Sequence, residues 1–251
     1  MTDLPPRLST AGPVARLCLS RPARRNRLGI DDITTLRAHL ATVAADPDIR
    51  VLIIEAIGPV FSAGFDLDAL AGGDIGDAED GPGGIGAVAS ALAALPQPTI
   101  ARLHGNVYGG AVDLALACDF RVGTAAISVL MPAARLGLHY YRSGLARAVQ
   151  RLGPDATRLI FILAEPLDAA SLLRLGFLTH LVPPAALDAT VDALASRLVT
   201  NAAPAVKGMK AAIEALATHH FDPSRFAASL EAAHKSPEFR DALAALGRAR
   251  S

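Results

Sequence analysis

The chain has 251 residues, of which 51% are hydrophobic and 19% are charged. This length and composition are typical of a globular protein with one large core, with or without an appended region. Its 24 Lys and Arg residues balance 24 Asp and Glu residues, so the formal net charge is zero. Neutrality removes the general electrostatic attraction to nucleic acid and to anionic membranes, and we expect neither as a partner.

The cysteines and the first residues indicate a cytoplasmic protein. Cys18 and Cys118 lie inside apolar runs and have neither the spacing of metal ligands nor that of a disulfide framework. Residues 1–13 lack the basic-then-apolar layout of a secretory signal, and no apolar run reaches about 18 residues without a charge or a proline. We therefore expect buried thiols, no bound metal and a cytoplasmic location.

Hydrophobic periodicity predicts alternating strands and helices in the first half of the chain and helices alone in the second. The strands are expected at 14–20, 51–57, 99–103, 120–123 and 125–130, and the helices between them at about 31–45, at 87–95 and from 110 onward. Later helices are expected at 145–152, 154–164, 168–175, 184–199, 203–217 and 223–234, with a last one capped by Ser236. This order indicates a layered α/β core at 1–195 and a helical region at 196–251.

One segment between these elements has a different composition. Residues 71–86 are rich in Gly and Asp, and we predict a mobile loop there. Residues 81–86 (GPGGIG) match the glycine pattern of dinucleotide-binding proteins. No predicted strand precedes them and Pro82 lies among them, so a dinucleotide site is rejected.

Residues 104–119 (HGNVYGGAVDLALACD) predict a strand that ends in a glycine turn and opens directly onto a helix. Gly109 and Gly110 lack side chains, so an oxygen atom could approach their backbone N–H groups at the positive end of the helix dipole. Asp113 would lie in the first helical turn. Two interpretations stay open: a site for a negatively charged oxygen, or a tight turn followed by an acid that complements the dipole.

A second glycine-bearing loop follows a second buried strand. Residues 61–67 (FSAGFDL) come after the predicted strand at 51–57, just as the glycine turn comes after the strand at 99–103. Two such loops could converge on one ligand.

Several segments, taken in order, resemble the enoyl-CoA hydratase/isomerase (crotonase) family. They are residues 21–26 (RPARRN), 61–67, 98–119, 132–137 (PAARLG), 164–170 (AEPLDAA), 176–183 (GFLTHLVP) and 236–240 (SPEFR). The resemblance implies an α/β fold that is a crotonase-like spiral of ββα units with a helical C-terminal trimerisation region. It also implies a homotrimer or a dimer of trimers.

The same resemblance implies the ligand and the residues that bind it. The substrate would be an acyl-CoA thioester, with coenzyme A as part of the substrate and no covalently bound cofactor. The backbone N–H groups of Phe65 and Gly110 would form an oxyanion hole, which stabilises a thioester enolate. Coenzyme A would contact Arg24, Arg25, Ala63, Asp66, Leu67 and, from a neighbouring subunit, Lys210.

The chain departs from the family pattern at the two positions where hydratases of this family carry glutamates. Asp113 stands at the first position, with a side chain shorter by one methylene group. Ala133 stands at the second and cannot transfer a proton. Hydration by two glutamates is therefore not expected.

Another group must then carry the proton. Candidates in the 131–144 loop are His139, Tyr140, Tyr141 and Arg142. Tyr140 resembles a tyrosine of family members that decarboxylate CoA esters, and we assign Asp113 and Tyr140 as catalytic residues. The main hypothesis is an acyl-CoA enzyme that stabilises an enolate. The alternatives are a CoA-ester decarboxylase or isomerase that uses Tyr140 and Asp113, and an acyl-CoA-binding member without activity.

Overall fold

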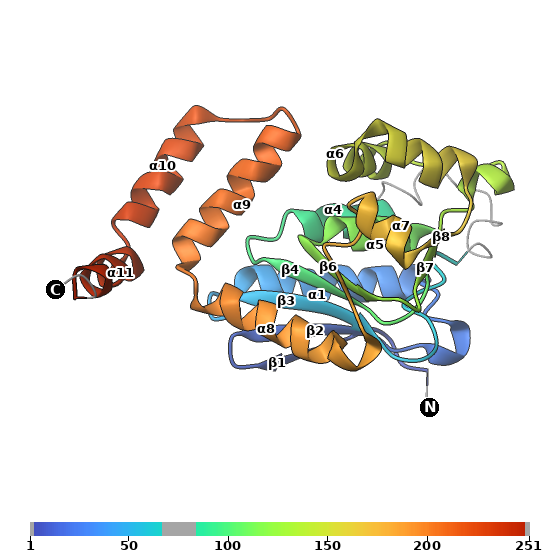
Figure 1. Ribbon diagram of the computed structural model, residues 1–251, viewed down its shortest axis with the longest axis horizontal. Coiled ribbons are helices and arrows are strands. Elements are labelled where there is room, and N and C mark those ends of the chain that lie inside the picture. The colour runs from blue at the N-terminus through green and yellow to red at the C-terminus, as the bar shows by residue number, and fades with distance from the viewer. Residues whose placement is uncertain (1–2, 67–83, 249–251) are drawn as a thin grey trace.

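The computed structural model describes residues 3–66 and 84–248, and its centre is a six-stranded sheet (Figure 1). The strand order is β1-β2-β3-β4-β6-β9. β1 pairs antiparallel with β2, and every later pairing in this sheet is parallel. The strands are β1 (Arg7–Ala11), β2 (Val14–Leu19), β3 (Val51–Ala56), β4 (Thr99–Leu103), β6 (Phe120–Thr124) and β9 (His180–Val182).

Both faces of this sheet are covered by helices, as a parallel sheet requires. Successive residues of a strand point to opposite faces, and β3 is apolar on both. Leu52 and Ile54 belong to the large core that includes α1 (Ile30–Ala45), α4 (Ile85–Ala93) and α5 (Gly110–Ala117). Val51 and Ile53 belong to a second cluster, formed with α8 (Leu187–Thr200).

A small second sheet fixes the start of α5. It consists of β5 (Val107–Tyr108), β7 (Ser128–Leu130) and β8 (Leu167–Asp168), in the order β5-β7-β8. β5 is parallel to β7, and Gly109 N donates a hydrogen bond of 2.9 Å to Leu130 O. The glycine turn is therefore held by main-chain bonds on the side of β7.

The chain then forms α6 (Arg142–Arg158), which packs on α4 and α5. Gly153 inside α6 has φ 78° and ψ 167°, so the helix is broken there, where the sequence predicts two separate helices. A π-helical turn (Leu159–Leu163) and α7 (Ala169–Arg174) follow, and short 3-10 helices lie at Pro22–Arg24, Ala133–Leu136 and Pro184–Ala186.

Three helices at the C-terminal end extend to one side of the sheet (Figure 1). They are α9 (Ala203–Ala217), α10 (Pro223–His234) and α11 (Pro237–Arg248). Lys210 attaches α9 to the core, because its Nζ donates to Gln97 O at 2.9 Å and to Asp119 Oδ2 at 2.7 Å. The expected division at residue 195 falls within α8, and we propose that the core extends to the end of that helix.

The structure confirms the expected strands and helices of the first half and the helices from 203 to 234. The prediction that only helices follow residue 153 is wrong, because β8 and β9 are strands. These strands have two and three residues, and they form by pairing with β7 and β6 rather than from a local pattern. β1 and β5 were not predicted either.

Two further predictions concern loops and cysteines. α4 begins at Ile85, so the end of the 71–86 segment is helical and not loop, whereas residues 71–83 lie outside the described residues. Cys18 and Cys118 are free thiols; Cys118 is buried as expected, and Cys18 is half-buried. Burial raises the pKa of the Cys118 thiol to about 12. Among the described helices, none combines the length and apolarity that crossing a membrane would need.

Candidate active site

The two glycine-bearing loops predicted to converge lie side by side. The first continues from β3, and the second runs from β4 through β5 into α5. Ser62 and Val107 form a parallel bridge, and Tyr108 N donates to Ser62 O at 3.0 Å. Main-chain hydrogen bonds thus join the loops directly.

Gly64 makes this close approach possible. Its φ is +87°, a conformation that residues with a Cβ rarely adopt. A Cβ at this position would lie 2.5 Å from Tyr108 O and 2.9 Å from Gly110 N. There is consequently no room for a side chain between the two loops.

The backbone N–H groups of Phe65 and Gly110 take no part in the hydrogen bonds that join the two loops. Leu28 N donates to Gly64 O, and Asp66 N donates to Leu28 O, so the N–H of Phe65 points away from Leu28. Gly110 is the first residue of α5 and has no partner within the helix. Neither N–H donates to another described residue, and a Cβ on Gly110 would lie 3.6 Å from Phe65 N. Such a pair can bind an oxygen that carries negative charge.

A buried asparagine, Asn26, holds the first loop in place by hydrogen bonds. Asn26 Nδ2 donates to Ile57 O and Val60 O at 2.8 and 3.1 Å. Ser62 Oγ donates to Asn26 O at 2.7 Å and accepts from Gly64 N at 3.0 Å. The sequence places Asn26 only in the family motif at 21–26 and does not show this role, because the partners of its side chain lie more than 30 residues away.

Of the residues expected at coenzyme A, Arg25 contacts the same loop, to which Ala63 and Asp66 belong. Ala63 N donates to Arg25 O at 2.8 Å, and the Arg25 side chain is exposed. Arg24 lies 3.8 Å from Asp3, and Asp66 pairs with Arg27 at 3.0 Å. Leu67 lies outside the described residues.

Lys210, which is also expected at coenzyme A, lies on α9. Its amine forms an ion pair with Asp119 of the same chain. A contact with a neighbouring subunit therefore stays a prediction.

Asp113 lies in a buried ion pair and has no exposed surface. Its Oδ1 accepts from Arg147 Nη1 at 2.7 Å, and its Oδ2 accepts from the Tyr141 hydroxyl at 2.6 Å. Arg147, whose side chain is 8% exposed, also donates to Ser90 Oγ on α4 at 3.0 Å. Both carboxylate oxygens are thus engaged in hydrogen bonds, and the side chain is fully buried.

The two tyrosines continue the hydrogen-bonded chain outward from Asp113. The hydroxyls of Tyr140 and Tyr141 lie 3.0 Å apart, and their rings stack with centroids 4.2 Å apart. Burial raises the pKa of the Tyr141 hydroxyl well above its usual value of 10, and the neighbouring Tyr140 and Asp113 raise it further. Tyr141 therefore keeps its proton at neutral pH.

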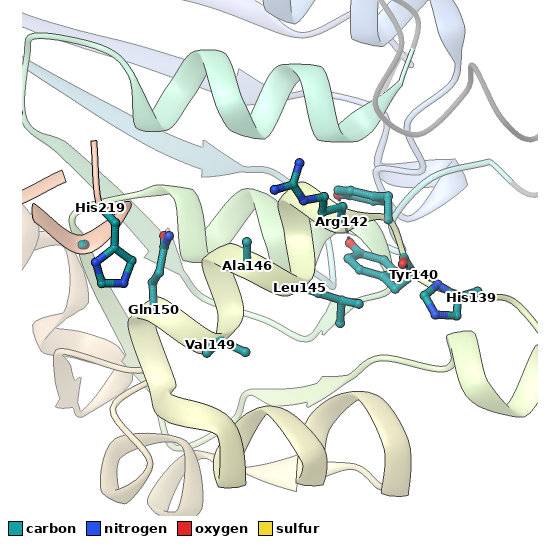
Figure 2. Close-up of a pocket in the computed structure, with 10 residues that line it drawn as sticks. His139, Tyr140, Arg142, Leu145, Ala146, Val149, Gln150 and His219 are labelled. Carbon is teal, nitrogen blue, oxygen red and sulfur yellow. Dashed lines mark hydrogen bonds between the residues drawn. The ribbon is translucent and has the colours of Figure 1, made fainter. Parts of the chain in front are cut away.

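A cavity of about 740 Å³ borders these tyrosines (Figure 2). Its wall is formed by the residues before α6, the first half of α6 and the end of α9. The lining residues include His139, Tyr140, Leu145, Val149 and His219. The wall is apolar along α6 and polar at both ends.

Ala133 contributes only a methyl group to this region. It is the buried first residue of a 3-10 helix and belongs to the same apolar cluster as Tyr141. The one histidine named as a candidate, His139, contacts a main-chain oxygen: its Nδ1 lies 2.9 Å from Tyr140 O. Within the described part of the chain, no three His, Cys, Asp or Glu residues form a group that could hold a metal ion.

Comparison with known proteins identifies the family. The family model for enoyl-CoA hydratase/isomerase matches residues 9–241. A carnitinyl-CoA dehydratase of Citrobacter koseri is 33% identical over 200 residues, which cover 79% of this chain and 76% of the relative.

Solved structures agree with that result. A protein from Hyphomonas neptunium, assigned to the enoyl-CoA hydratase/isomerase family, has a TM-score of 0.89 at 26% identity, covering 97% of this chain and 94% of its own. An enoyl-CoA hydratase/carnithine racemase from Magnetospirillum magneticum has a TM-score of 0.86 at 25% identity, with 100% and 94% covered. The fold and the site thus define a crotonase-type protein. The chain belongs to the enoyl-CoA hydratase/isomerase family, as its sequence motifs indicated.

Sequence reasoning missed Arg147 as a partner of Asp113. The two residues are 34 positions apart, and neither α5 nor α6 shows the pairing in its own pattern. The sequence shows only that Arg147 lies on the face of α6 that packs against the core, and this position does not identify Asp113 as its partner.

The close approach of the two loops can be tested with a matched pair of glycines. Gly137 also has a positive φ, +72°, but a Cβ there would meet nothing within 4 Å. Gly137→Ala should lower the free energy of unfolding by about 1–2 kcal/mol, because the positive φ strains the backbone of alanine and the added Cβ meets no other atom. Gly64→Ala should lower it by about 1–3 kcal/mol more, because its Cβ meets main-chain atoms. Equal losses in urea unfolding would contradict the tight packing at Gly64.

The buried ion pair can be tested on α6. Arg147→Met leaves the Asp113 carboxylate buried without its cation and should lower the free energy of unfolding by about 3–5 kcal/mol. Arg158 lies on the same helix, and its ion pair with Asp155 is exposed, so Arg158→Met should cause no measurable loss. Chemical denaturation of both variants measures the difference, and similar curves would argue against a buried pair.

Proposed function

We propose that this protein binds an acyl-CoA thioester and stabilises the enolate form of its acyl group. The adjacent N–H groups of Phe65 and Gly110 are the observation that carries the proposal. In this arrangement the thioester oxygen accepts both hydrogen bonds and gains negative charge as the α-proton leaves. Fixed donors favour the charged state over the neutral one, an effect of about 3–4 kcal/mol per donor in comparable sites.

We propose further that coenzyme A lies along the loop at residues 63–67. The exposed Arg25, joined through its carbonyl to Ala63, meets a phosphate, with Arg24 nearby. The adenine group lies against Ala63, Asp66 and Leu67. In an assembled protein, Lys210 of α9 belongs to the same binding region of a neighbouring copy.

Asp113 is the proposed base of the reaction, with Tyr140 as its partner. The relatives named carnitinyl-CoA dehydratase support chemistry in which water is lost from, or added to, a CoA ester. The methyl group of Ala133 favours reactions that need a single carboxylate. Isomerisation meets this condition, and so does decarboxylation with Tyr140 as the acid.

We also propose that the protein is a cytoplasmic homotrimer or a dimer of trimers. Helices α9 to α11 support this, because large apolar side chains on them are exposed in the single chain. These include Met209, Ile213, Leu216, Leu230, Leu243 and Leu246, which are between 45% and 63% exposed. Other copies of the chain would cover these side chains.

Hydrogen exchange at the α-carbon tests the proposed reaction. Saturated, enoyl-, 3-hydroxyacyl- and malonyl-type CoA esters are incubated with the protein in heavy water and analysed by mass spectrometry. We expect deuterium at the α-carbon of at least one ester, and a loss of about 100-fold or more in Asp113→Asn, because a base is removed. Glu55→Gln is the control. Glu55 lies on β3 and pairs with Arg16, and this variant should exchange the α-proton at the wild-type rate.

Two other outcomes of this experiment would change the assignment. Carbon dioxide release from a malonyl-type ester would favour the decarboxylase. Thermal stabilisation by acyl-CoA without exchange or product from any ester would favour a binding protein without activity.

The coenzyme A contact can be tested separately. Arg25→Ala should weaken binding of an acyl-CoA by about tenfold, since a charge-assisted hydrogen bond contributes about 1.5–3 kcal/mol. Binding of the matching acyl-pantetheine thioester, which lacks the nucleotide phosphates, should not change. Arg174→Ala on α7 serves as a control for loss of surface charge, and equal effects on both ligands would remove Arg25 from the site.

A further inference from the structure

The hydrogen-bonded chain that leads out from Asp113 has a fixed direction. Asp113 Oδ2 accepts from the Tyr141 hydroxyl at 2.6 Å, and the Tyr141 hydroxyl lies 3.0 Å from that of Tyr140. We infer that Asp113 acts as a base through two hydroxyl groups, Tyr141 and then Tyr140, and that Arg147 is the positioning residue that sets the direction of this relay. The inference rests on the proposed enolate function.

Arg147 sets the direction through the charge of Asp113. An arginine at 2.7 Å favours the ionised carboxylate, and an ionised carboxylate can only accept hydrogen bonds. The single proton of Tyr141 is therefore committed to Asp113, so the Tyr141 oxygen accepts from Tyr140. Tyr140 in turn presents the lone pairs of its oxygen, and not its proton, to a ligand.

Burial decreases along the relay in the same direction. Asp113 has no exposed surface, Tyr141 is 7% exposed, and Tyr140 is half-buried against the cavity of about 740 Å³. Tyr141 lines the cavity too, but Tyr140 is the most exposed of the three groups, which makes it the end of the relay that meets a ligand. Asp113 is also one helical turn from Gly110, so the relay begins next to the proposed oxyanion hole.

The proton transfer balances in three linked steps. The C–H bond at the α-carbon breaks, its electron pair forms the enolate, and the proton bonds to the Tyr140 oxygen. The original proton of Tyr140 moves to Tyr141, and that of Tyr141 moves to Asp113 Oδ2. One negative charge passes from Asp113 to the enolate oxygen held by Phe65 and Gly110, while Arg147 keeps its charge. The reverse sequence returns a proton to carbon.

Among the described elements packed against the relay, few other side chains are ionisable. α4 carries no ionisable side chain, α5 carries only Asp113, and β5 carries only Tyr108. On the cavity side, the neighbouring groups are His139, Arg142 and His219. Within the described part of the chain, the relay thus connects the buried ion pair of Asp113 and Arg147 with a cavity whose polar groups lie at its ends.

The relay can be tested without changing Asp113. Tyr141→Phe keeps the ring but removes the middle hydroxyl, and it should lower the rate of α-proton exchange by about 100-fold while KM changes less than about threefold. Tyr140→Phe should have the same effect, and the double variant should lose no more than either single one, because the hydroxyls act as a unit. Arg147→Lys should keep exchange within about tenfold of wild type, whereas Arg147→Met should fall as far as Tyr141→Phe.

A second readout does not depend on activity. The chain has three tyrosines and no tryptophan, so ring-labelled tyrosine gives three NMR signals. We expect Tyr140→Phe to shift the Tyr141 signal, and Arg147→Met to shift the signals of both tyrosines. Arg151→Met, one turn further along α6, should shift neither, because Arg151 pairs with Glu214 and Asp119.

The outcomes separate this inference from the function on which it rests. Exchange by the wild-type protein that persists unchanged in Tyr141→Phe would overturn the relay and leave the enolate function standing. A wild-type protein that exchanges none of the esters would overturn both.

Discussion

The candidate site depends on the close approach of two stretches of backbone. Gly64 passes so near Tyr108 and Gly110 that a single Cβ atom would collide with main-chain atoms. Hydrogen bonds from Asn26 and Ser62 hold the first loop, and β5 and β7 hold the second. The N–H groups of Phe65 and Gly110 are therefore held in place by the fold itself, as the proposed oxyanion hole requires.

The second constraint is the charge of Asp113 inside the core. A buried carboxylate is costly unless it is paired, and Arg147 provides the pair from a different helix. The ion pair with Arg147 offsets the free-energy cost of burying the Asp113 carboxylate, and the side chain has no contact with solvent. Among the described contacts of Asp113, the Tyr141 hydroxyl carries a transferable proton, and it is the contact through which the proposed relay runs.

Much of the fold could be predicted from the sequence, because the long elements have strong local patterns. The strand at 99–103 and the helices at 203–217 and 223–234 have the bounds that the periodicity indicates. Strands β8 and β9 were missed, since two or three residues hold too little pattern and the pairing partner lies far along the chain. The part of the candidate site made of glycine loops was predictable because glycine, which lacks a Cβ, adopts the positive φ of Gly64 and Gly109 and leaves room for the close approach of the two loops.

The sequence by itself determined the family, the layered α/β core and the two glycine loops, because these follow from local composition and from motifs in a fixed order. It also determined that Ala133 cannot transfer a proton. Only the tertiary structure decided what surrounds Asp113. The ion pair with Arg147 and the chain of hydroxyls through Tyr141 to Tyr140 join segments about 30 residues apart, and such contacts are set by how α5 and α6 pack rather than by either sequence alone.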